Sequence, residues 1–248
     1  MRTRGNPLQL ALWAPREAAP GWNVRISRRA RRMSMRVFPG GRVEVVVPPG
    51  VGVPAVERFV ARHREWAERR SREFALQATH AHERRPERVA LALTGQSWSL
   101  ELLPGQRWSV VDRGDGVLRV RTRAGSDAQV SQALLRWLSR LAHAELGQRL
   151  QSVSREIRID YGRMILRRQR TRWGSCSSAG TISLNVCLMF QRPEVVRYLM
   201  IHELCHRRYM NHSPRFWRLV ESFEPDWRAL DAELLKGWRH VPGWMFPS

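Results

Sequence analysis

The chain of 248 residues has one lysine, three cysteines and no long apolar segment. Because Lys236 is the only lysine, the net charge of +21 comes almost wholly from arginine; it predicts attraction to phosphate, acidic protein or anionic lipid without specifying a function. Cys176, Cys187 and Cys205 are odd in number and irregularly spaced, which argues against a disulfide scaffold and favours a reducing compartment. The lack of an apolar run of about 20 residues argues against a membrane-spanning helix.

The N-terminal segment does not have the pattern of a signal peptide. Basic residues precede a short apolar stretch at residues 8–14, but Pro7, Gln9 and Pro15 interrupt or bound it. The hydrophobic fraction of 43% is sufficient for a packed core. We therefore expect a cytoplasmic protein without a membrane partner, in which residues 1–23 form a flexible segment.

An α+β fold is expected, with a β-rich N-terminal half at residues 24–125. Runs of β-branched residues bounded by glycine and proline predict its strands. Val56, Phe59 and Val60 recur at the spacing of a long amphipathic helix, which we place at residues 54–76. The expected strands are residues 33–38 and 42–47, which form a hairpin, and residues 97–103, 107–111 and 117–121.

Residues 126–248 are expected to form a C-terminal half in which one helix carries the candidate site and packs on a small sheet. Apolar residues at helical spacing predict an amphipathic helix over residues 127–151. A further helix should begin at Pro193, because proline is favoured at the first helical position, and should run to about Met210. The strands predicted between these helices are residues 164–168, 172–177 and 181–185.

Inside the predicted helix, His202 to His206 have the pattern H-E-x-x-H. Two histidines four residues apart lie one turn apart on the same side of a helix, so both imidazoles can bind one metal ion. Glu203 lies beside them, where its carboxylate can reach a water on the metal without taking a coordination position. Chance produces the pattern in roughly one comparable chain in a hundred, so a buried helix that merely contains histidines is the weaker interpretation. A closed structural site needs four ligands, and Cys205 points away from the two histidines.

A catalytic zinc site needs a third protein ligand and an open fourth position. His212 is the best candidate, because Ser213-Pro214 is typical of the start of another helix and places His212 in a turn. This arrangement requires the first helix to break near Met210 or Asn211, and asparagine tolerates the left-handed conformation that such a break uses. The alternative third ligands are acidic residues of the following segment: Glu221, Glu224 and Asp226.

Two sequence blocks resemble the YgjP-like metallopeptidase family, whose relatives are the SprT-like zincins. The blocks are TRWGSCSSAGTISLN at residues 171–185 and HELCHRRYMNHSPRFW at residues 202–217, in the order and spacing of that family. Weaker similarity extends over residues 24–235. Together the two blocks are much more specific than H-E-x-x-H alone.

The resemblance implies a zinc peptidase whose C-terminal half has a zincin-like architecture. His202, His206 and His212 would be the zinc ligands, and Glu203 would be the general base and acid. Tyr209 stands where the related metzincins carry a glycine, while the spacing to the third histidine is retained.

The first of the two blocks is also a candidate for substrate binding. A strand at the edge of a sheet near a metal can pair with an extended peptide through main-chain hydrogen bonds, and Gly174 would allow a close approach. The candidate residues are Trp173, Gly174, Ser175 and Cys176. The alternative interpretation is structural, with Trp173 anchoring the core and Gly174 forming a bend.

The sequence thus predicts a zinc-dependent metallopeptidase that hydrolyses a protein or peptide substrate with a metal-activated water and Glu203. Two other functions stay open. One is a nucleic-acid-binding protein with an incidental or structural zinc, or a protease recruited to nucleic acid; the other is a zinc-binding adaptor without catalysis. The arginine excess motivates the first, although coding composition and a solvated face also produce such a bias. Tyr209, Arg172 and His240 are candidates for stabilising the oxyanion, and oligomeric state has no sequence signal.

Overall fold

The computed structural model describes residues 22–38, 42–78, 85–105, 109–122 and 126–246. Contacts between residues divide the chain into two compact units, residues 1–77 and 78–248. The domain boundary expected between residues 125 and 126 lies inside the second unit and stays a prediction. Most of the expected flexible segment, residues 1–23, lies outside the described residues. In the part of the chain that is described, no helix is both long and apolar enough to cross a bilayer.

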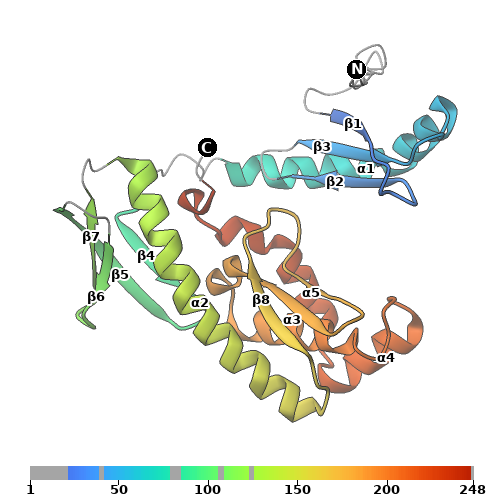
Figure 1. Cartoon of the computed structure of the whole chain (residues 1–248). Coiled ribbons are helices and arrows are strands. Elements are labelled where there is room, and N and C mark those ends of the chain that lie inside the picture. The colour runs from blue at the N-terminus through green and yellow to red at the C-terminus, as the bar shows by residue number, and fades with distance from the viewer. Residues whose placement is uncertain (1–21, 39–41, 79–84, 106–108, 123–125, 247–248) are drawn as a thin grey trace, which may run out of the picture. The chain divides into compact units, whose positions relative to one another are not determined.

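In its described residues, the first unit contains a three-stranded sheet and one long helix (Figure 1). Its elements are β1 (Trp22–Ile26), β2 (Ser34–Val37), β3 (Val43–Val47) and α1 (Val53–Ala78). β2 and β3 are antiparallel, so the predicted hairpin is confirmed, although its turn at residues 39–41 lies outside the described residues. β1 is parallel to β3 and has no counterpart among the predicted strands. Val45 and Val47 of the sheet form an apolar core with Val56 and Val60 of α1, which holds helix and sheet together.

A four-stranded sheet and a long helix form the first part of the second unit. The strands are β4 (Arg88–Leu91), β5 (Gln96–Pro104), β6 (Ser109–Asp112) and β7 (Val117–Thr122), of which β4 has no predicted counterpart. Their order is β4-β5-β7-β6, with β5 parallel to β7 and both outer pairs antiparallel. Helix α2 (Asp127–Ile157) begins after the N-cap Ser126 and is followed by the C-cap Arg158, which has a left-handed backbone. The predicted end of this helix at residue 151 is therefore too early.

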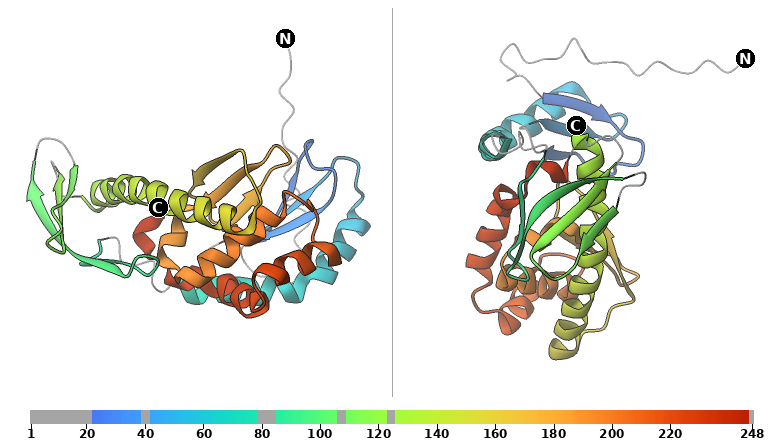
Figure 2. Two further views of the ribbon diagram at one scale, coloured as in Figure 1. Left: turned by 90° about the horizontal axis from the view of Figure 1, so that it is seen from below. Right: turned by 90° about the vertical axis from the view of Figure 1, so that its left-hand side faces the viewer.

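Helix α2 lies between the four-stranded sheet and a second, smaller sheet (Figure 1, Figure 2). In the smaller sheet, β8 (Arg163–Arg167) is parallel to β10 (Thr181–Asn185), and β9 (Gly174–Cys176) is antiparallel to β10. β9 is shorter than the predicted strand at residues 172–177. Because the order is β8-β10-β9, one edge of β9 has no strand partner within the described residues. Gly180, in the tight turn before β10, has a φ of 81°, which favours glycine.

Three helices follow the small sheet. They are α3 (Pro193–Cys205), α4 (Pro214–Phe223) and α5 (Trp227–Lys236), accompanied by the short 3-10 segments η2 (Val186–Phe190), η3 (Gly237–His240) and η4 (Gly243–Met245). α3 contacts α2, α4, α5 and β9, and most of its side chains are buried. Neighbours on so many sides hold the side chains of α3 in fixed orientations. The combination of helices with small sheets confirms the expected α+β class.

Candidate metal centre and active site

The end of α3 allows the third histidine to return towards the first two. The helix ends at Cys205, so its predicted continuation to about Met210 is wrong. The N–H groups of Arg207 and Arg208 bond to carbonyls three residues earlier, which tightens the last turn before the chain leaves the helix. The expected left-handed conformation at Asn211 is not used. The break therefore comes earlier than predicted and has a different backbone geometry.

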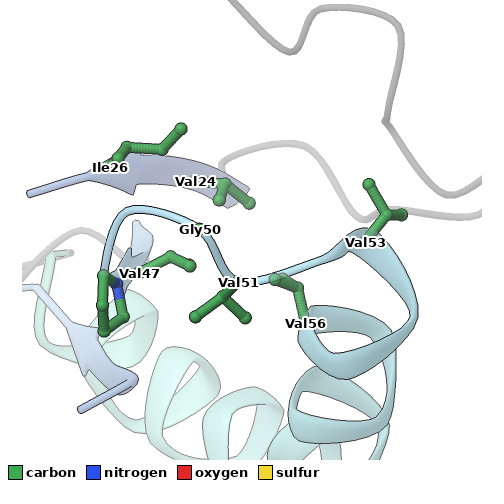
Figure 3. Close-up of a pocket in the computed structure, with 8 residues that line it drawn as sticks. Val24, Ile26, Val47, Gly50, Val51, Val53 and Val56 are labelled. Carbon is green, nitrogen blue, oxygen red and sulfur yellow. The ribbon is translucent and has the colours of Figure 1, made fainter.

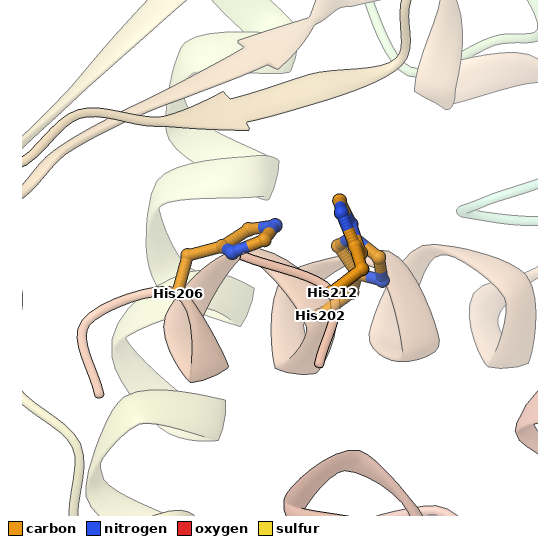
Figure 4. A group of neighbouring side chains, drawn as sticks. All are labelled: His202, His206 and His212. Carbon is orange, nitrogen blue, oxygen red and sulfur yellow. The ribbon is translucent and has the colours of Figure 1, made fainter. Parts of the chain in front are cut away.

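Because of this break, the imidazole of His212 returns to those of His202 and His206 at the end of α3, and the three converge (Figure 4). The possible ligand atoms of His202, His206 and His212 all lie within 4.8 Å of one another, and the Nε2 atoms of His202 and His212 are 3.1 Å apart. His206 is buried, His202 is partly buried and His212 is exposed, so the cluster is accessible to solvent on one side. One metal ion could contact all three nitrogens and keep a further position for solvent or substrate.

The protonation of the histidines suits metal binding. Burial, followed by the charges of the two other histidines, lowers the pKa of His202 to about 3. Burial also lowers the pKa of His212. Nδ1 of His206 lies 3.0 Å from the carbonyl oxygen of Tyr209, and an N–H that donates to this carbonyl leaves Nε2 as the ligand atom. Because metals bind neutral imidazole, all these features favour a metal at neutral pH.

Aromatic side chains of α4 pack against the imidazoles. Phe216 is fully buried, and its ring centroid lies 4.5 Å from that of His206 and 4.9 Å from those of the other two histidines. Trp217 lies beside His202 and stacks on Trp227 with a centroid distance of 4.2 Å. This packing limits rotation of the imidazole rings and covers one side of the cluster.

The acidic residues considered as alternative third ligands have other positions. Glu221 pairs with Arg228 at 2.7 Å and Glu224 with Arg197 at 2.6 Å. Asp226 is the N-cap residue of α5. None of the three acids belongs to the cluster of possible ligands, which consists of histidines in the part of the chain that the structure describes. The geometry therefore favours a histidine as the third ligand.

Glu203 follows His202 in α3, and its side chain is almost completely buried. The residue is 5% exposed, and its Oε2 has no hydrogen-bond partner among the described residues. Burial raises the pKa of this carboxyl to about 8, while the positive charge of Arg172 acts in the opposite direction. A buried carboxyl with a strongly shifted pKa, next to a possible metal site, is typical of a group that transfers protons.

The backbone of β9 lies directly against the side chain of Glu203. A Cβ atom at Gly174 would be 2.6 Å from Oε1 of Glu203 and 3.0 Å from its Cγ and Cδ. Glycine at this position therefore provides the space that the carboxyl occupies. Ser175 and Cys176 follow on the same strand and are partly exposed. Burial and then the charge of Glu203 raise the pKa of Cys176, which is thus part of the same environment.

Trp173 precedes β9 and lies in the interior. It is 7% exposed and stacks on Trp238 with a centroid distance of 4.2 Å and an angle of 26° between the rings. A Cβ atom at the neighbouring Gly237 would crowd Gln191 and Trp173, so glycine leaves room for both side chains. The tryptophan pair thus anchors the start of β9, and direct contact of Trp173 with a substrate stays a prediction.

The residues that form this centre lie within a region that matches a known family. The model of the YgjP-like metallopeptidase domain matches residues 31–236, which include β9, α3 and all three histidines. The chain belongs to the YgjP-like metallopeptidase family. The resemblance identified from residues 171–185 and 202–217 is therefore confirmed.

Two crystal structures resemble part of this YgjP-like chain. One is the metallopeptidase zymogen abylysin of Pyrococcus abyssi, with 23% identity and a TM-score of 0.33, covering 36% of this chain and 90% of abylysin. The other is the metallopeptidase zymogen jannalysin of Methanocaldococcus jannaschii, with 16% identity and a TM-score of 0.33, covering 36% of this chain and 92% of jannalysin. No significant match is found among curated proteins.

Two further residues of the YgjP-like centre, Tyr198 and Asp231, are absent from the residues predicted from sequence. The Tyr198 hydroxyl donates to Oδ1 of Asp231 at 2.8 Å and lies 3.5 Å from Nδ1 of His202. A hydroxyl oxygen whose proton goes to Asp231 can accept the N–H of Nδ1, which leaves Nε2 of His202 for a metal. The spacing of four residues between Tyr198 and His202 is a signal in the sequence, whereas nothing in the sequence relates Asp231 on α5 to α3.

Replacement of either residue should weaken metal binding. Tyr198→Phe and Asp231→Asn are each expected to lower zinc affinity by about 10- to 100-fold, because His202 loses the groups that orient its ring. Competition with a chromophoric chelator measures the change. Asp127→Asn, in an exposed ion pair at the start of α2, is the matched control and should leave the affinity unchanged. Wild-type affinity in both Tyr198 and Asp231 variants would contradict the role of this pair.

Proposed function

We propose that this YgjP-like protein is a zinc-dependent metallopeptidase whose catalytic region, residues 126–248, has a zincin-like architecture. The observation that carries the proposal is the convergence of three imidazoles beside a buried carboxyl, one oxygen of which has no hydrogen-bond partner among the residues that the structure describes. Membership of a metallopeptidase family supports peptide-bond hydrolysis as the reaction.

Zinc suits the donor set formed by the three histidines. Three imidazole nitrogens with one accessible position are a common set of ligands for catalytic zinc. His202, His206 and His212 would hold the ion, which when bound supplies a Lewis acid for the attacking water and the scissile carbonyl. The lowered pKa of His202 supports this role, since the ring is neutral before a metal arrives.

Glu203 transfers the protons of the proposed reaction. Its carboxylate takes a proton from the attacking water and delivers it to the nitrogen of the leaving amine as the peptide C–N bond breaks. Burial raises the pKa of Glu203 to about 8, so both the carboxylate that accepts a proton and the acid that donates one are accessible near neutral pH.

The edge of β9 is the proposed binding site for the substrate backbone. Gly174 and Ser175 pair with β10 on one side, and an extended peptide could pair with the other side through main-chain hydrogen bonds. Such a peptide would pass close to Glu203, which lies against Gly174. Arg172, whose positive charge acts on Glu203, is the candidate that we propose for stabilising the oxyanion.

The other functions predicted from sequence gain no support from the family match or from the histidine cluster. These functions are nucleic-acid binding with an incidental zinc and a non-catalytic adaptor. Recruitment to nucleic acid and a cytoplasmic location stay predictions.

Removal of the metal tests the proposed function. Treatment with a strong chelator is expected to abolish cleavage of an unfolded protein, and a stoichiometric amount of zinc should restore it. The reason is that the attacking water depends on the metal, and the mechanism has no protein nucleophile that could replace it. The measurement is cleavage monitored by electrophoresis, alongside the metal content of each sample. Undiminished cleavage by protein from which all metal has been removed would refute the proposal.

A further inference from the structure

The first unit contains an apolar cleft, which the catalytic residues in the second unit do not line (Figure 3). The cleft holds about 420 Å³ of space not filled by protein atoms, part of it open to solvent. Aliphatic side chains from β1, from the end of β3, from the segment that follows it and from the start of α1 make up most of its lining: Val24, Ile26, Val47, Val51, Val53 and Val56. The remaining lining residues are a proline and a glycine, so none of the described residues that line the cleft is charged.

Two aliphatic residues of the lining are largely exposed. Ile26 is 54% exposed and Val53 is 43% exposed. Aliphatic side chains grouped at an apolar cleft, unlike isolated ones scattered over a surface, are typical of a binding site. An apolar group that enters the cleft would cover them.

The cleft lies at an edge of the three-stranded sheet. β1 pairs with β3 alone among the described residues, and Val24 and Ile26 are alternate residues of β1 on the side of the cleft. An extended peptide can add to such an edge through main-chain hydrogen bonds while alternate side chains enter a neighbouring pocket. The geometry therefore fits a polypeptide backbone.

An arginine-rich loop directly follows β1. Its exposed guanidinium groups have no acidic partner in the described part of the chain: Arg28, Arg29, Arg31 and Arg32. Arg25, by contrast, is paired with Glu44 at 3.2 Å. Because Arg28 is only two residues from Ile26, the positive charge begins within about 7 Å of the cleft along the chain. An occupant of the cleft would therefore be favoured by acidic residues next to its apolar ones.

We propose that the β1 edge and its cleft bind an extended segment of the protein substrate in which aliphatic side chains adjoin acidic ones. This inference rests on the proposed function, because it takes a polypeptide as the substrate. Nucleic acid would satisfy the arginine loop but has no aliphatic side chain for the cleft. A second copy of a chain with a net charge of +21 would bring like charges together.

Peptide binding to the full-length Glu203→Gln protein tests the inference without requiring cleavage. The probe is a fluorescent peptide with isoleucine at alternate positions followed by aspartates, and in a comparison peptide serine replaces each isoleucine. Fluorescence anisotropy should show at least about tenfold weaker binding of the serine peptide, because it cannot fill the cleft. Equal binding of the two peptides would overturn the inference.

Paired variants locate the binding site. Ile26→Ser with Val53→Ser should weaken binding of the isoleucine peptide about tenfold, and Arg28→Gln with Arg29→Gln should weaken it and reduce its dependence on salt. Arg58→Gln with Arg62→Gln removes the same charge from exposed positions of α1 and should have no comparable effect. Unchanged melting temperatures establish that the substituted proteins are folded.

Other occupants give distinct results, each of which overturns the inference. Displacement of the peptide by an oligonucleotide, with no effect of the cleft variants, would identify a nucleic-acid site. A dimer that the cleft variants dissociate would identify a second copy as the occupant.

Cleavage tests a different claim. If the peptide binds as expected but the wild-type protein cleaves nothing, the proposed function fails and the docking site remains.

Discussion

Glu203→Gln is expected to lower the rate of peptide cleavage by about 10²- to 10⁴-fold and to leave the zinc content unchanged. The amide has nearly the same size as the carboxylate but cannot take a proton from the attacking water. Zinc should be retained because the cluster of possible ligands consists of His202, His206 and His212 and does not include Glu203. Turnover of an unfolded protein and the amount of zinc per chain are the two measurements.

Glu221→Gln is the matched control for this substitution. Glu221 lies on α4, and its exposed side chain pairs with Arg228, so loss of its charge should change neither turnover nor zinc content. Wild-type turnover in the Glu203 variant would mean that another group is the base. Loss of zinc together with activity would mean that Glu203 acts as a ligand.

Gly174→Ala is expected to lower cleavage by about 100-fold, because a small displacement of a catalytic group is sufficient for a loss of that size. The new Cβ would lie 2.6 Å from Oε1 of Glu203 and 3.0 Å from its Cγ and Cδ, so either the carboxyl or β9 must move. Crowding of this kind in a buried site typically costs about 1–3 kcal/mol of stability. Steady-state kinetics and the free energy of unfolding measure the two effects.

Two further variants separate the steric effect from a general effect of alanine. Gly147→Ala, within α2, places its Cβ 3.6 Å from Met164, an ordinary contact, and should stabilise the helix by about 0.5–1 kcal/mol without a change in cleavage. In a Glu203→Ala background, Gly174→Ala should lower the free energy of unfolding very little, because the carboxyl atoms that the new Cβ would crowd are absent. If Gly174→Ala still lowers the free energy of unfolding in the Glu203→Ala background, the loss of stability does not come from the contact between Gly174 and Glu203.

The sequence predicts the parts of the centre in which chemistry follows from local spacing. His202, Glu203 and His206 lie within about one turn of a helix, so their approach to one another requires no knowledge of the tertiary structure. The start of a new helix at Ser213-Pro214 is confirmed, and His212 lies in the connection between α3 and α4. The residue at which α3 ends is less predictable, because the tightened last turn of this helix depends on backbone hydrogen bonds and not on a particular residue type.

Contacts between distant segments are not predictable from such patterns. Gly174 lies against Glu203, Trp173 stacks on Trp238, and Asp231 binds Tyr198, each across two different elements. These pairs depend on tertiary packing, so the sequence left both a structural and a functional interpretation of Trp173 and Gly174 open.

Secondary structure shows the same division between local and distant signals. Strand β1 is only five residues long and pairs with β3, well separated from it in sequence, so its alternation of apolar residues is too short to distinguish from chance. Helix α2, by contrast, contains a local signal beyond the predicted end. Val153 and Ile157 continue the spacing of Leu146 and Leu150, and all four are buried.

Anomalous X-ray diffraction at the zinc absorption edge tests the central claim most directly. Crystals of the zinc-loaded protein should show one strong peak about 2.0–2.1 Å from one nitrogen of each of His202, His206 and His212, with Glu203 outside the coordination sphere. A zinc peak bound elsewhere with these three imidazoles empty, or one in which an acid replaces His212, would contradict the metal centre described above.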